Sequence, residues 1–84
     1  MIKLLKYFVE MESMYIDFSI PVCNGLRDVV KEEIEILDKA FREDDVGTYL
    51  MHEDAVETYL KTALEDRDIS EFDCAQMFRR FGWK

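Results

Sequence analysis

The chain has 84 residues, of which 49% are hydrophobic and 36% charged, with three glycines, one proline and two cysteines. This composition excludes an intrinsically disordered, fibrous or disulfide-rich protein and is typical of one compact domain over residues 1–84. The net charge is −8, from 19 acidic and 11 basic residues. An acidic surface disfavours DNA, RNA and anionic membranes, and it favours a protein partner with a basic surface.

The sequence contains neither a membrane span nor a recognisable targeting segment. No run approaches the roughly 18 apolar residues that a spanning helix needs. The apolar start is interrupted by Lys6 and Glu10 and lacks a small-residue cleavage site, so we interpret it as mature protein. Cys23 and Cys74 form no CxxC motif, and we expect reduced, packed thiols in a cytoplasmic protein.

Residues 2–22 allow two interpretations. Apolar residues recur at helical spacing: Leu4, Phe8, Met11, Tyr15 and Phe18. This stripe predicts a helix over 2–17 that ends before Pro21. A strand-like alternation also runs through the second half: Ile16, Phe18, Ile20 and Val22. The alternative is therefore an α+β fold with an N-terminal β-hairpin within 2–22.

Two further helices are predicted in the middle of the chain. Asn24 is a good N-cap for a helix that should end between Phe41 and Glu43. Its expected core face consists of Leu26, Val29, Val30, Ile34, Leu37 and Phe41. The next helix should cover about 52–65. Residues 46–51 either extend it by a turn or form a connector, and Gly47 favours the connector.

The last helix has the clearest boundaries. Ser70 and Asp73 have the spacing of a capping box, and Arg79 and Arg80 suit the negative end of the helix dipole. Gly82 is placed for a left-handed C-terminal cap. The sequence therefore predicts an all-α, small four-helix bundle-like domain.

No pattern of catalytic or metal-binding residues is readable. His52 is the only histidine and lacks the partner that an HExxH zinc site requires. The oxygen side chains from Asp66 to Ser70 resemble the start of a calcium loop. However, Glu71 stands where glycine is needed, and Met77 stands where a bidentate glutamate is needed. We therefore expect no enzyme, no cofactor and no metal.

We expect the acidic helix faces to form the surface that binds a partner protein. The candidate partner-binding residues are Glu32, Glu35, Asp38, Glu53, Asp54, Glu57 and Trp83. We expect a non-enzymatic inhibitor or regulator that docks on a basic, possibly nucleic-acid-binding, protein surface. Small size and acidity are shared with several unrelated classes of small inhibitors, such as immunity, anti-restriction and anti-CRISPR proteins, without any shared motif.

Two alternatives remain open. The aromatic residues could make a helical homodimerisation or scaffold module. The last two helices could imitate a DNA-binding helix-turn-helix, but Glu71 and Asp73 would then face the bases, so direct nucleic-acid binding is not expected.

Overall fold

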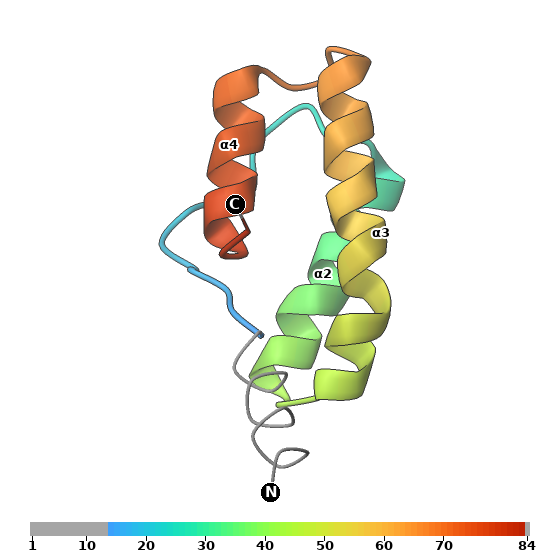
Figure 1. Cartoon of the computed structure of the whole chain (residues 1–84), viewed down its shortest axis with the longest axis vertical. Helices are drawn as coiled ribbons and strands as arrows, with labels where there is room; N and C mark the ends of the chain where they lie inside the picture. Colours follow the sequence, from blue (N-terminus) through green and yellow to red (C-terminus); the bar gives the residue numbers. More distant parts are fainter. Residues whose placement is uncertain (1–13, 84) are drawn as a thin grey trace, which may run out of the picture.

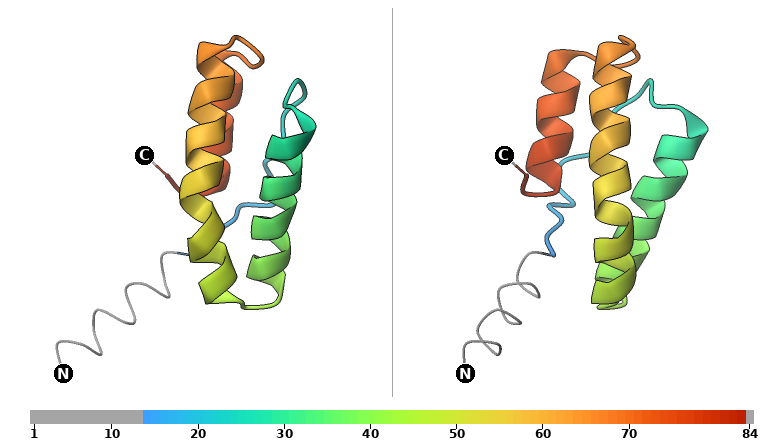
Figure 2. Two further views of the ribbon diagram at one scale, coloured as in Figure 1. Left: turned by 90° about the vertical axis from the view of Figure 1, so that its right-hand side faces the viewer. Right: turned by 45° about the vertical axis from the view of Figure 1, so that its right-hand side comes forward.

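The computed structural model describes residues 14–83 and contains, within that range, three α-helices and no strand. They are α2 (Asp28–Arg42), α3 (Val46–Glu65) and α4 (Glu71–Arg80). Consecutive helices run in opposite directions, and α3 is central because it packs against both of the others (Figure 1). The shorter α4 accompanies only the C-terminal half of α3 (Figure 2).

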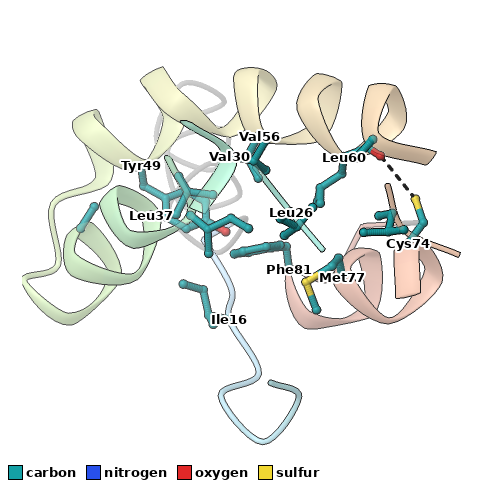
Figure 3. Close-up of a cluster of buried hydrophobic side chains, with 14 residues drawn as sticks. Ile16, Leu26, Val30, Leu37, Tyr49, Val56, Leu60, Cys74, Met77 and Phe81 are labelled. Atoms are coloured by element: carbon teal, nitrogen blue, oxygen red, sulfur yellow. Dashed lines mark hydrogen bonds between the residues drawn. The ribbon is translucent and has the colours of Figure 1, made fainter. Parts of the chain in front are cut away.

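One hydrophobic core joins the three helices. Figure 3 shows side chains of α2, α3 and α4 directed into a shared space, with Ile16 entering from the irregular N-terminal segment. The largest fully buried side chains are Tyr49, Phe81, Ile34, Leu37, Leu60, Met77 and Val56. Leu26 is also buried, so within residues 14–83 the irregular segment before α2 contributes Ile16 and Leu26 to the core.

The four-helix prediction is corrected to three helices within residues 14–83. Residues 14–17, predicted as the last turn of a helix, are irregular, and residues 14–22 contain no strand of the alternative hairpin. The remainder of the predicted 2–17 helix lies outside the described residues. The backbone of this segment bonds to other elements: Asp17 N–H donates to the Arg80 carbonyl at 2.7 Å, and the Tyr15 carbonyl accepts from the Tyr49 hydroxyl at 2.9 Å.

Two predicted helix starts are also corrected. Asn24 lies in a turn with Gly25, whose φ of +92° is left-handed, and α2 begins only after Arg27. In contrast, α3 begins six residues earlier than predicted, at Val46. The Asp45 side chain accepts the Thr48 N–H at 3.1 Å and caps the helix. This cap outweighs the low helix propensity of glycine at position 47.

The boundaries predicted for α4 are confirmed. Ser70 and Asp73 form the capping box, although the bond from Ser70 N–H to Asp73 is long at 3.5 Å. At the other end Gly82 has a φ of +71°. The Trp83 N–H donates to the Phe78 carbonyl at 2.8 Å and completes a Schellman motif. The chain therefore turns back immediately after α4, and Trp83 is brought onto the core.

The cap of α3 should make stability depend on pH. Side-chain and backbone hydrogen bonds from Thr48 hold the pKa of Asp45 below its ordinary value of 3.8. Folding thus favours the carboxylate, so this stabilisation is present above the unfolded-state pKa and is lost as pH falls through the folded-state pKa. Asp45→Asn keeps a hydrogen-bond acceptor that does not titrate. We expect wild type to melt above this variant at neutral pH and the difference to shrink as pH falls below the ordinary value of 3.8, measured by circular dichroism. A difference that stays constant across this range would contradict the assignment.

Candidate protein-binding site

His52 belongs to a contact between helices. Its Nδ1 lies 2.9 Å from Glu33 Oε1, and both side chains are partly exposed, so the pair links α3 to α2. Within residues 14–83 no group of histidine, cysteine or acidic side chains is arranged to hold a metal ion. In the same range, no helix is both long and apolar enough to cross a bilayer.

Asp38 lies in a nearly buried ion pair. The Nη2 of Arg80 is 3.0 and 2.9 Å from the two carboxylate oxygens of Asp38, and the side chains are only 5% and 14% exposed, respectively. The guanidinium also donates to the Ile20 carbonyl and lies against the rings of Phe18 and Phe81. The charge of Asp38 is therefore neutralised within the protein, at the point where α2, α4 and the N-terminal segment meet.

Glu53 and Trp83 are joined by a hydrogen bond. The Trp83 indole N–H donates to Glu53 Oε2 at 3.0 Å, and the indole stacks on Phe81 with a centroid distance of 4.8 Å. Phe78 meets the same indole edge-on at 5.4 Å. Trp83 thus closes the end of the core while its polar edge is satisfied by an acid of α3.

Glu32 and Glu35 lie on the exposed side of α2, where positive charges balance the negative ones. The exposed acids of this helix are Asp28, Glu32 and Glu35, and its exposed bases are Lys31, Lys39 and Arg42. Three exposed acids and three exposed bases therefore share one helix. The net field that this side shows to a partner is weak.

Asp54 and Glu57 lie in different surroundings, on what we call the outer face of α3: Leu50, Met51, Asp54 and Glu57. Positions 50, 54 and 57 share one side of a helix, and 51 adjoins them. Met51 is 75% exposed and Leu50 is 38% exposed. The only Lys or Arg of α3 is Lys61, which pairs with Glu57 at 3.1 Å across a largely exposed contact. With Asp54 and Glu57 against this one base, the face keeps a small excess of negative charge.

Leu50 and Met51 were not among the residues predicted to bind a partner. They were missed because residues 46–51 were assigned to a connector, in which helical spacing has no meaning. The signal that could have found them is the N-cap at Asp45, which extends the helix backward and places both residues one turn before Asp54.

Comparison with protein families, with curated proteins and with solved structures finds no match for this chain.

Proposed function

We propose that this protein is a small binding module, an inhibitor or regulator, that docks the outer face of α3 on a basic and partly apolar surface of another protein. The observation that supports this proposal is the combination on one face of two exposed apolar side chains with two acids. On α2 the acids are matched by bases, and Asp38 and Glu53 have partners inside the protein.

The two kinds of side chain would act differently in such a complex. Leu50 and Met51 would supply affinity by burying apolar surface, and the flexible methionine adapts to an irregular partner. Asp54 and Glu57 would attract lysine or arginine, which raises the association rate and selects the orientation. The partner that fits is a basic amphipathic helix or a surface with the same pattern.

The two alternative functions, a homodimerisation module and a DNA-binding protein, have less support. A symmetric dimer through this face would bring Asp54 and Glu57 of two copies together, and like charges oppose that contact. Binding of DNA through α4 would require basic side chains at the start of this helix, where the acidic Glu71 and Asp73 lie. Arg80 is buried against Asp38 and is not available to a phosphate.

Charge reversal on two helices provides a matched test. Immobilised wild type is compared with Asp54→Lys/Glu57→Lys on α3 and with Glu32→Lys/Glu35→Lys on α2, two variants of identical net charge. From an extract of the source cells, we expect wild type and the α2 variant to retain the same defined protein. The α3 variant should bind this purified partner at least about tenfold more weakly, a loss of about 1.4 kcal/mol.

Two further measurements complete this test. Binding of the partner should weaken as salt rises from about 0.05 to 0.5 M, because exposed charges are screened. Met51→Ala should weaken binding at every salt concentration. Equal loss with the α2 and α3 variants, or affinity that is independent of salt, would contradict the proposal.

A further inference from the structure

The segment that precedes α2 runs along α4 in the opposite direction. At one end, Asp17 N–H donates to the carbonyl of Arg80, and the Arg80 side chain donates to the carbonyl of Ile20. At the other end, Gly25 approaches the loop before α4 so closely that a Cβ on it would lie 2.5 Å from the carbonyl oxygen of Asp68. The chain therefore passes from the end of α4 to a point just before its start (Figure 1).

The lengths of the two segments set their register. The three residue steps from Ile20 to Cys23, before the turn at Asn24 and Gly25, span about 10 Å when extended, at about 3.3 Å each. Within α4, which begins at Glu71, about seven residue steps cover the same length, at about 1.5 Å each. Cys23 is three steps from Ile20, which corresponds to about seven helical residues before Arg80. This register places Cys23 at the level of Asp73 and Cys74.

Burial and electrostatics agree with this register. Cys74 is buried in the core, and Cys23 is partly buried against the same cluster. Burial raises the pKa of the Cys23 thiol, and the nearby negative charges of Asp73 and of the Cys74 thiolate add to this effect. The Cys74 thiol makes only a weak contact, at 4.0 Å, with the Leu60 carbonyl, so no strong hydrogen bond opposes its reaction.

We propose that Cys23 and Cys74 are a site of reversible oxidation, at which an intramolecular disulfide ties the segment before α2 to α4. The co-reactant is a small-molecule disulfide such as oxidised glutathione. The Cys23 thiolate attacks one of its sulfurs and releases one glutathione thiol. The Cys74 thiolate then attacks Cys23 in the mixed disulfide and releases the second. Two protein thiols are oxidised and one glutathione disulfide is reduced to two thiols.

The surroundings of the pair set how fast the bond forms. Burial raises the pKa of Cys74 as it does that of Cys23, so few molecules carry a thiolate at neutral pH. Below these pKa values the thiolate fraction, and with it the rate of closure, should rise about tenfold per pH unit. Once formed, the bond joins residues 51 positions apart and restricts the unfolded chain.

Mass spectrometry of the full chain tests this proposal directly. The protein is incubated at micromolar concentration with oxidised glutathione near about pH 8, and the remaining thiols are then alkylated. We expect a monomer lighter by two hydrogen atoms, with neither cysteine alkylated. Its thermal midpoint should rise by about 10 °C or more and return to the original value with dithiothreitol.

Cys23→Ser is the matched control and should keep a single thiol without the rise in midpoint. A stable glutathione adduct on one cysteine, a covalent dimer, or two thiols that both remain open to alkylation would overturn the proposal. None of these outcomes depends on the partner proposed for the outer face of α3, so the two proposals are tested separately.

Discussion

Asp38→Ala should lower the free energy of unfolding by about 3–5 kcal/mol, the usual effect of removing one member of a buried ion pair. The reason is that Arg80, whose side chain is 5% exposed, would keep its charge but lose its carboxylate partner. A chain of this length has a total stability of only about 4–13 kcal/mol. The variant should therefore be largely unfolded at a urea concentration that leaves wild type folded, as measured by circular dichroism.

Two controls separate this effect from a general loss of negative charge. Glu35→Ala removes an exposed acid from the same helix and should change stability by less than about 0.5 kcal/mol. Replacement of both Asp38 and Arg80 by leucine should recover most of the loss, because the Arg80 Nε has no hydrogen-bond partner among the described residues and the pair is incompletely satisfied. A free energy of unfolding for Asp38→Ala within about 1 kcal/mol of the wild-type value would mean that Arg80 does not hold the three segments together.

Gly25→Ala is expected to destabilise the protein by about 2–4 kcal/mol. A side chain at a φ of +92° is strained, and its Cβ would meet the Asp68 carbonyl oxygen at 2.5 Å. Since this oxygen is part of the backbone, it cannot move aside as a flexible side chain would. The expected loss therefore exceeds the effect of the dihedral angle alone.

Gly47→Ala is the matched control for this substitution. Gly47 is helical, and the nearest atom to an added Cβ is an Asp45 carboxylate oxygen at 3.8 Å. This variant should be more stable than wild type by about 0.5–1 kcal/mol, because alanine is the better helix former. Urea unfolding of both variants gives the comparison. Equal effects at the two glycines would mean that the chain does not pass close to Asp68.

The local signals in the sequence predicted α4 and the centre of α2 and α3. The capping box at Ser70 and the glycine at position 82 act within a few residues, so they can be read without the fold. The path of residues 14–27 could not be read in this way. Ile16 is buried by contacts with distant helices, and the partners of its backbone neighbours lie on α3 and α4.

The candidate site shows the same division between local and distant information. Helical spacing predicted exposed positions for Asp54 and Glu57; in the structure Asp54 is exposed and Glu57 is partly exposed. It could not reveal that Asp38 pairs with Arg80, because 42 positions separate them.

Chemical-shift mapping can test whether the outer face of α3 binds a basic, partly apolar partner. The isotope-labelled full chain is titrated with a synthetic amphipathic helix of leucine and lysine, and separately with a peptide of the same pattern carrying glutamate for lysine. We expect the basic peptide to shift the amide signals of the outer face of α3 and the acidic peptide to have no effect. The signals around Glu32 and Glu35 should stay in place with both peptides. The shifted signals should be those of Leu50, Met51, Asp54 and Glu57. Shifts centred on α2, or equal shifts with both peptides, would contradict the proposal.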